Sequence, residues 1–211
     1  MRIILLAIVS SILVASAAAA PKDDIRHVDF RNFAYPWSYP GWSGSLEWIS
    51  TSERNETRLV NGKWRDSEND AGRDDPSAPF SGLTLESVSY AHLSDSSQEQ
   101  AIVVLRFDTG GTQYLYFVYI YTMQGSAPKL LGYFHAGDRA ASGLYQVYAN
   151  GGNLVVELFD PDKRIGDCCS DGFVRTRWNW RNTRFEQVGA AEFGTPKSTS
   201  RLPVSTFGVH G

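Results

Sequence analysis

Two long runs of apolar residues near the middle of the chain set the pattern for the rest. Residues 101–107 (AIVVLRF) and 114–123 (YLYFVYIYTM) carry apolar side chains at both odd and even positions. Because successive side chains of a strand point to opposite faces of its sheet, such runs are typical of strands that are covered on both faces. We therefore expect these two segments to be the central strands of a β-sheet.

Further runs with strand periodicity surround this centre. They occupy residues 57–65, 82–93, 128–137, 144–159, 173–180 and 184–188. The second of them changes phase between Leu85 and Val88, which predicts a β-bulge or a bend. Hairpin turns are predicted at Asn61-Gly62 and at Asn150-Gly151-Gly152-Asn153, because Asn and Gly accept the positive φ of tight turns. A third turn is expected around Arg181-Asn182-Thr183.

The first third of the chain is less regular. Residues 27–35 (HVDFRNFAY) alternate weakly, and residues 45–50 (SLEWIS) form a short candidate strand. Residues 66–79 are polar and rich in breakers, which predicts a long exposed loop. A small helix is compatible with residues 66–80 or 136–143, although no segment has the period of an amphipathic helix. The predicted fold is mainly β: a single antiparallel β domain of about ten strands, curled or two-layered, with little helix.

The N-terminal residues have the pattern of a secretory signal peptide. Arg2 is followed by an apolar run through Val14 and then by small residues up to Ala20. The run is too short to cross roughly 30 Å of hydrocarbon comfortably. No later stretch approaches about 18 uninterrupted apolar residues, so no membrane span is expected after signal removal. The predicted organisation is a signal peptide at 1–19, a β domain at 20–188 and a loose tail at 189–211. The predicted location is secreted or periplasmic.

The composition limits which classes of partner are expected and which interactions can stabilise the folded domain. The formal net charge is −3, which gives no reason to expect nucleic acid or an anionic membrane as a partner. Two cysteines are too few for a fold framed by disulfides, so a packed core must hold the domain together. Six Trp, ten Tyr and eleven Phe supply large side chains for that core.

The two cysteines, Cys168 and Cys169, are neighbours in the segment GDCCSDG. Consecutive Cα atoms lie about 3.8 Å apart, and ordinary disulfides span about 4.4–6.8 Å, so a bridge between them closes a strained ring. The alternatives are a vicinal disulfide in a rigid turn, two free thiols, an intermolecular bridge or a metal site. Asp167 and Asp171 disfavour thiolate, which favours a structural role first and a redox sensor second. No histidine stands at ligand spacing, and no metal site is predicted.

Aromatic residues are concentrated in the segment YPWSYPGWSGSLEW at residues 35–48. They are Trp37, Tyr39, Trp42 and Trp48, separated by prolines that stiffen the chain and glycines that bend it. Exposed rings would form a stacking platform for a glycan or an apolar surface for a protein partner. The alternative is that these rings fold back and close one end of the β core.

A second aromatic segment, residues 173–180 (FVRTRWNW), alternates with arginine. A strand here places Arg175 and Arg177 on one face and Trp178 and Trp180 on the other. The arginine face is interpreted as solvated and partly ion-paired. Its alternative role is to grip an anionic polymer.

Three segments in this order resemble an uncharacterised family of exported bacterial proteins. They are residues 28–37 (VDFRNFAYPW), residues 90–123, and residues 168–180 (CCSDGFVRTRWNW). In that family a Cys-Cys pair precedes a terminal hairpin of Arg, Trp and Tyr residues. The resemblance implies an exported β domain and carries no known activity.

The segment before the central strands also resembles a single repeat of integrin-type β-propellers, in which an Asp-rich loop holds calcium. The corresponding positions are His92, Ser94 and Ser96, with Asp95 and Glu99 nearby. Most of the carboxylate charge of such a loop is missing, and no period of 40–50 residues recurs. A solvated turn is therefore expected here.

Catalytic motifs do not stand out: the chain has no G-x-S-x-G elbow, no H-E-x-x-H and no P-loop. We therefore predict an exported, non-catalytic β domain with a binding or structural role at the cell envelope. Its expected partner is an envelope glycan or protein, and no cofactor is implied. One alternative is a polysaccharide or peptide hydrolase, for which the acidic residues in or beside strands are Glu47, Glu86, Asp108 and Glu157. The other is a redox-responsive module built on the two cysteines.

Overall fold

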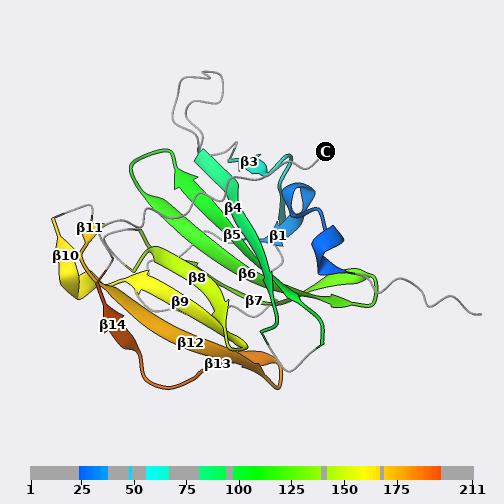
Figure 1. Cartoon of the computed structure of the whole chain (residues 1–211). Helices are drawn as coiled ribbons and strands as arrows, with labels where there is room; N and C mark the ends of the chain where they lie inside the picture. Colours follow the sequence, from blue (N-terminus) through cyan, green and yellow to red (C-terminus); the bar gives the residue numbers. More distant parts are fainter. Residues whose placement is uncertain are drawn as a thin grey trace, which may run out of the picture.

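The computed structural model describes residues 24–37, 48, 56–66, 81–93, 97–138, 142–166 and 169–195. These residues form two five-stranded sheets and a small N-terminal layer (Figure 1). Every pairing between labelled strands in the described residues is antiparallel. The prediction of a mainly β, antiparallel fold with little helix is confirmed.

The first sheet, which we call sheet I, contains the two central strands predicted from the sequence. Its order is β3 (Lys63–Arg65), β4 (Ser81–Ala91), β5 (Gln100–Thr109), β6 (Tyr114–Gln124) and β7 (Ala127–Ala136). The phase change predicted in β4 is present, because the register with β5 shifts between Leu85 and Ser87. The turn that enters β3 has φ values of 54° at Asn61 and 82° at Gly62, as its sequence predicts.

The second sheet, sheet II, follows sheet I in the chain. Its order is β13 (Arg184–Gln187), β12 (Phe173–Arg181), β9 (Asn153–Phe159) and β8 (Leu144–Asn150), and β14 (Glu192–Gly194) also pairs with β12. The predicted hairpins are present, since Asn150 pairs with Asn153 and Arg181 pairs with Arg184. A short hairpin of β10 (Arg164–Ile165) and β11 (Cys169–Ser170), preceded by the 3-10 turn η3 (Pro161–Lys163), lies between β9 and β12.

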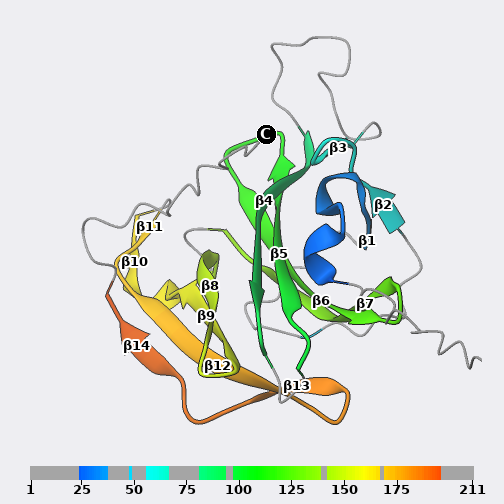
Figure 2. The ribbon, with the colours of Figure 1, turned by 45° about the vertical axis from the view of Figure 1, so that its right-hand side comes forward.

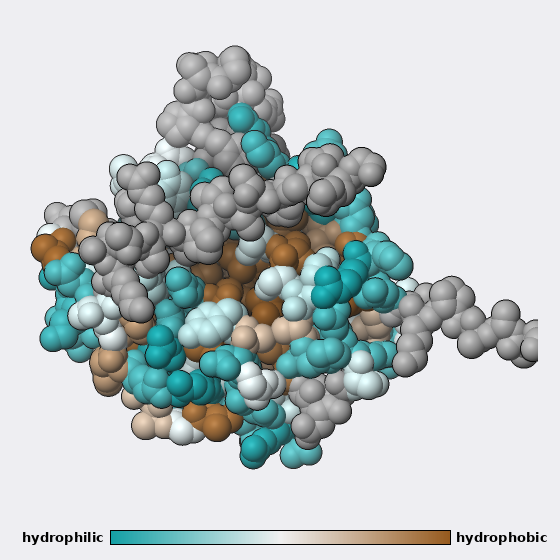
Figure 3. All heavy atoms as spheres, viewed as in Figure 1, coloured by the Kyte–Doolittle hydropathy of each residue, from teal (hydrophilic) through white to brown (hydrophobic). Residues whose placement is uncertain are grey.

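Sheet I is covered on both faces, which explains its unbroken apolar runs. One face packs on sheet II through Ile102, Val104, Val118, Ile120, Leu154, Val156 and Phe185. The other face packs on the N-terminal layer through Ile25, Phe30, Tyr35, Trp37, Leu59, Val103, Phe107, Phe117 and Tyr119. Figure 2 shows this N-terminal layer on one side of sheet I and sheet II on the other. In Figure 3 apolar residues show between the two sheets, with polar residues around them.

The N-terminal layer differs from the strand predicted at residues 27–35. Two 3-10 turns, η1 (Ile25–His27) and η2 (Phe30–Asn32), stand there, and only β1 (Ala34–Pro36) is extended, paired with β2 (Glu56–Arg58). The side chains of Asp24 and Asp29 accept hydrogen bonds from the backbone N–H of Arg26 and Arg31. Such local caps compete with strand pairing, which is why a weak alternation did not produce a strand.

The prediction of a loose segment from Gly189 onward is wrong for Glu192–Gly194. These residues form β14, which pairs with Phe173–Arg175 on the same edge of β12 that β13 uses further along. The four residues Val188–Ala191 connect β13 to β14, with Val188 N–H bonded to the Arg177 carbonyl and Gly189 at φ 74°. This connection interrupts the alternation of apolar and polar residues in the sequence, although pairing with the edge of β12 resumes after it.

Several predictions fall outside the described residues: the signal peptide, the loop at 66–79 apart from Asp66, the strand at 45–50 apart from Trp48, and the tail from residue 196. No helix is described within 136–143, where Gly137 and Asp138 form isolated bridges with Gly143 and Ser142. Within the described ranges, none of the helices has the length and apolar character needed to cross a membrane.

Candidate functional site

The candidate site is an arginine pair on the outer face of sheet II. Trp178 and Trp180 of β12 pack into the core between the sheets. Because side chains alternate along a strand, Arg175 and Arg177 point to the opposite, outer face. Their side chains are 30% and 35% exposed, so both guanidinium groups reach solvent.

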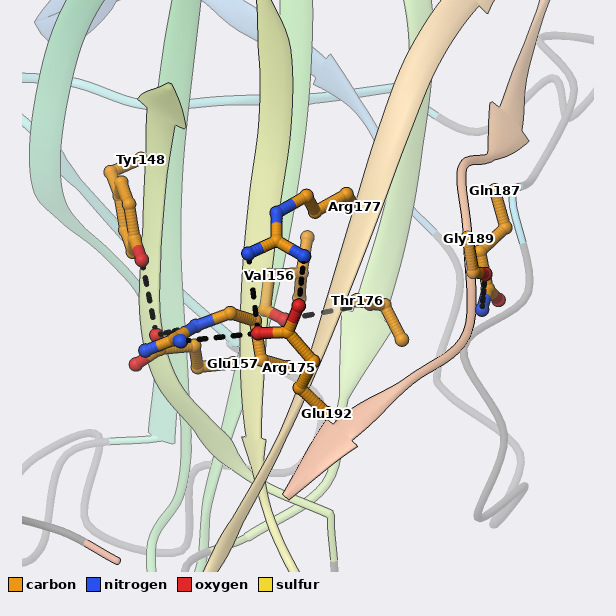
Figure 4. Close-up of polar contacts among 9 residues, drawn as sticks. All are labelled: Tyr148, Val156, Glu157, Arg175, Thr176, Arg177, Gln187, Gly189 and Glu192. Atoms are coloured by element: carbon orange, nitrogen blue, oxygen red, sulfur yellow. Dashed lines mark hydrogen bonds and ion pairs between the residues drawn. The ribbon is translucent and has the colours of Figure 1, made fainter. Parts of the chain in front are cut away.

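Arg175 is anchored by a buried carboxylate. Glu157 of β9 lies directly across from Arg175 and is only 2% exposed. Its Oε1 accepts hydrogen bonds from Arg175 Nε at 2.6 Å and from the Tyr148 hydroxyl at 3.1 Å (Figure 4). Two donors on one buried oxygen satisfy that oxygen and fix the orientation of the arginine.

Glu192 of β14 joins the two arginines. It is the cross-strand neighbour of Arg175, whose Nη1 lies 3.4 Å from Glu192 Oε2. Arg177 donates from both terminal nitrogens, Nη1 to Oε1 and Nη2 to Oε2 at 3.2 Å. Figure 4 shows the Glu192 carboxylate between the two guanidinium groups. The arginine pair therefore already holds one carboxylate, supplied by the chain itself.

Aromatic rings support the other side of Arg175. Its guanidinium carbon lies 5.3 Å from the centre of the Phe173 ring, a cation–π distance. The Phe173 ring stacks on Tyr145 at 5.2 Å, and Tyr145 also contacts Phe159 at 5.3 Å. The arginine is thus held by a carboxylate on one strand and a packed ring on its own strand.

The contacts keep the charges of the cluster in place. The hydrogen bond from Arg177 lowers the pKa of Glu192 below its ordinary value, and the hydrogen bond to Glu157 raises the pKa of Arg175. Burial, followed by the negative charge of Glu157, raises the pKa of Tyr148. With pKa values shifted in these directions, the side chains of the cluster bind ions well but do not exchange protons readily near neutral pH.

We expect the Glu192 carboxyl to titrate below the ordinary glutamate range in carbon-13 NMR spectra. Because its pKa is lowered on folding, its contribution to holding β14 is present above the ordinary glutamate pKa and is lost as the pH falls through the lowered value. In Arg177→Gln the titration should move back toward the ordinary range. Identical titration curves in the two proteins would contradict the ion pair.

The structure packs the described part of the predicted aromatic platform against the β core. Trp37 is 9% exposed and its ring lies 4.7 Å from Phe107 and 4.9 Å from Phe117. Trp48 stacks on Phe185 at 4.2 Å, on the opposite face of sheet I. Trp37 is therefore a core residue, and Trp48, which is half-buried, packs against the core between the sheets, so both rings fold back onto the β core. The other two predicted residues, Tyr39 and Trp42, lie outside the described residues.

Cys169 begins β11 and is disulfide-bonded. Cys168 lies outside the described residues, so the vicinal pairing stays a prediction. The next residue, Ser170, is buried, and its hydroxyl donates to the Asp160 carbonyl at 2.5 Å. This contact ties the cysteine hairpin to the end of β9, immediately before β12 begins.

The loop resembling a calcium site is only partly described. Residues 94–96 lie outside the described ranges, and Glu99 accepts two hydrogen bonds from Arg26, at 2.6 and 2.8 Å. Its carboxylate is therefore engaged by an arginine. Among the residues that the structure describes, no three His, Cys, Asp or Glu side chains gather as a metal ion would require.

Sequence reasoning found half of the arginine–glutamate cluster. The alternation in β12 placed Arg175 and Arg177 on one face, but the hairpin at Asn150–Asn153 sets only the pairing of Glu157 with Gln146 of β8, so no local signal paired Glu157 with Arg175. Glu192 was missed because it follows Gly189, in a segment whose composition predicted no structure. Comparison with known protein families, curated proteins and solved structures finds no match to this chain, so the family resemblance stays a prediction.

Proposed function

We propose that the protein is an exported, non-catalytic β domain of the cell envelope that binds a carboxylate-bearing partner through the outer face of sheet II. One observation carries the proposal: the pair Arg175 and Arg177 holds the carboxylate of Glu192 at the surface. The signal-like residues 1–19 and the oxidised cysteine support export.

The geometry of the pair suits this role. An arginine presents a planar fork of donors that matches a carboxylate, and its charge does not depend on pH. Arg175 is already oriented by the buried Glu157, so little side-chain entropy is lost when a partner binds. A strand also spaces the two guanidinium groups rigidly along one face.

The carboxylates considered for a hydrolase favour binding over acid–base chemistry. Glu157 is occupied by Arg175 and Tyr148, and Glu86 lies 3.0 Å from Arg106. A third candidate, Asp108, accepts a hydrogen bond from the Gly110 backbone N–H at 3.1 Å. These contacts support a contact surface whose charges are permanent.

The proposal predicts that mature protein binds immobilised polyglutamate or polygalacturonate more strongly than uncharged dextran. Arg177→Gln should weaken this binding roughly tenfold, the effect of losing one charge-assisted contact. Binding should also fall as salt rises, since the contact is at the surface. Surface plasmon resonance on the three supports measures both effects.

Arg184→Gln is the matched control. Arg184 belongs to the same sheet, pairs with Glu186 at 2.9 Å and is 77% exposed, so its replacement removes the same charge outside the cluster. The control should leave the binding within about twofold of the wild type. Equal losses in Arg177→Gln and Arg184→Gln, or no binding to either polymer, would overturn the proposed contact surface.

A further inference from the structure

We propose that the partner is an extended acidic segment of a protein, which replaces β14 on the edge of β12. The inference rests on the proposed function, that the arginine pair binds a carboxylate, and it names the class of that partner. Extended peptides are commonly recognised by adding a strand to a sheet edge, with backbone pairing for affinity and side-chain contacts for specificity. β14 makes both kinds of contact with β12.

The register defines what this edge recognises. Glu192 pairs with Arg175 and Gly194 pairs with Phe173, so both lie on the outer face with the arginines. A Cβ at Gly194 would lie 2.4 Å from Cζ of Phe173, whose ring is backed by Tyr145. The edge therefore selects an acidic residue followed two positions later by glycine.

β14 is weakly held for a paired strand. It has three residues, and its central side chain, Phe193, is 74% exposed. The Glu192 side chain is 46% exposed, so water can take the place of its ion pairs with the two arginines when β14 opens. Small, exposed elements of this kind open most easily in folded proteins.

β14 can leave without disturbing the strand before it. β13 has its own pairing of four residues with Trp178–Arg181, and its Phe185 is buried between the sheets. The connection Val188–Ala191 contains Gly189 at φ 74° and makes one ladder-like bond, from Val188 to Arg177. Opening of β14 would thus expose three residues of β12 edge beside a pair of arginines.

A peptide fits this edge better than an acidic polysaccharide. Both bear carboxylates, but only a peptide supplies N–H and C=O groups for the backbone of Phe173–Arg175 and a residue small enough to lie on the Phe173 ring. The polysaccharide is the outcome that the experiment must exclude.

The experiment uses the synthetic peptide acetyl-Ala-Ala-Glu-Phe-Gly-Thr-amide, the sequence of residues 190–195, as the probe. It is titrated by NMR against wild-type mature protein and against two variants that release β14, Glu192→Gln and Gly194→Val. The first removes the internal carboxylate, and the second creates the clash with Phe173 at constant charge. Both should bind the peptide roughly tenfold more tightly than the wild type, in which β14 competes at high effective concentration.

Glu186→Gln is the charge control, since it removes one negative charge from β13 and leaves β14 paired. It should bind the peptide like the wild type. Amide exchange across β9 and β12 reports whether each variant keeps sheet II folded. Three altered peptides should each lose most of the binding: one with Glu replaced by Gln, one with Gly replaced by Val, and one methylated on the backbone nitrogens of Glu and Phe. Both nitrogens are methylated because one of two consecutive N–H groups faces β12.

The outcomes separate this inference from the proposed function. Strand replacement is overturned if the peptide binds all four proteins equally. It is also overturned if the peptide binds none of them while polygalacturonate binds in an Arg177-dependent manner. In either case the carboxylate surface stands. If neither probe binds any protein, both proposals fail. Tighter binding to Glu192→Gln and Gly194→Val, with loss for the three altered peptides, supports strand replacement.

Discussion

Replacement of Trp37 by alanine is expected to lower the free energy of unfolding by about 3–5 kcal/mol, the usual cost of removing a buried large aromatic side chain. The Trp37 ring lies among Phe107, Phe117 and Trp64, and the residue is 9% exposed. Its chain segment is also anchored, because the Tyr119 hydroxyl donates to the Pro36 carbonyl at 2.9 Å. Little of the cavity left by alanine can therefore collapse. Denaturant unfolding followed by circular dichroism measures the change.

Phe193→Ala provides the comparison for Trp37→Ala. Phe193 is a large aromatic residue in a strand, but it is 74% exposed, so its loss should change stability by no more than about 0.5 kcal/mol. If Trp37→Ala were as mild as Phe193→Ala, the Trp37 ring would belong to the surface. The aromatic platform would then return as the preferred contact site.

The second large effect is expected from Glu157→Ala, which should lower the free energy of unfolding by about 2–3 kcal/mol. The substitution leaves Arg175 and the Tyr148 hydroxyl without their shared acceptor at a position that is 2% exposed. The cost lies below that of a fully buried pair because the Arg175 side chain is 30% exposed and can turn partly to water. Binding to polyglutamate should fall as well, since Arg175 loses its fixed orientation.

A double-mutant cycle separates the contact from the general effect of substitution. Glu157→Gln keeps the shape and one acceptor oxygen, and it should cost less than Glu157→Ala. In an Arg175→Gln background, Glu157→Gln should cost markedly less than in the wild type, because the partner is already absent. Additive effects of the two substitutions would show that the ion pair does not couple the two strands.

Local sequence signals predicted the elements whose geometry depends on neighbours in the chain. The turns at Asn61-Gly62 and Gly151-Gly152 followed from the positive φ that these residues accept. The bulge in β4 followed from a phase change within one run. The two-sided cover of β5 and β6 followed from their apolar residues at both phases. In each case the signal lies within one segment: backbone conformation at the turns, and side-chain burial in the strands.

The same signals were misleading where polar caps or an irregular step intervened. Asp24 and Asp29 cap the 3-10 turns η1 and η2, although the apolar spacing of residues 27–35 indicated a strand. The connection around Gly189 separates β13 from β14, and its small residues have the composition of a loose C-terminal segment. Neither outcome is visible from hydrophobic periodicity, because both depend on which backbone group finds a partner.

By itself, the sequence determined that the domain is antiparallel β, that its centre is covered on both faces, and that Arg175 and Arg177 share one face of a strand. Periodicity is enough for these properties, since side-chain direction alternates within each strand. Only the tertiary structure decided that the Trp37 ring is buried in the core, that the Trp48 ring packs against it, and that Glu192 returns to the arginines. Those contacts join residues far apart in the chain, and the register of paired strands, which no single segment encodes, brings them within reach.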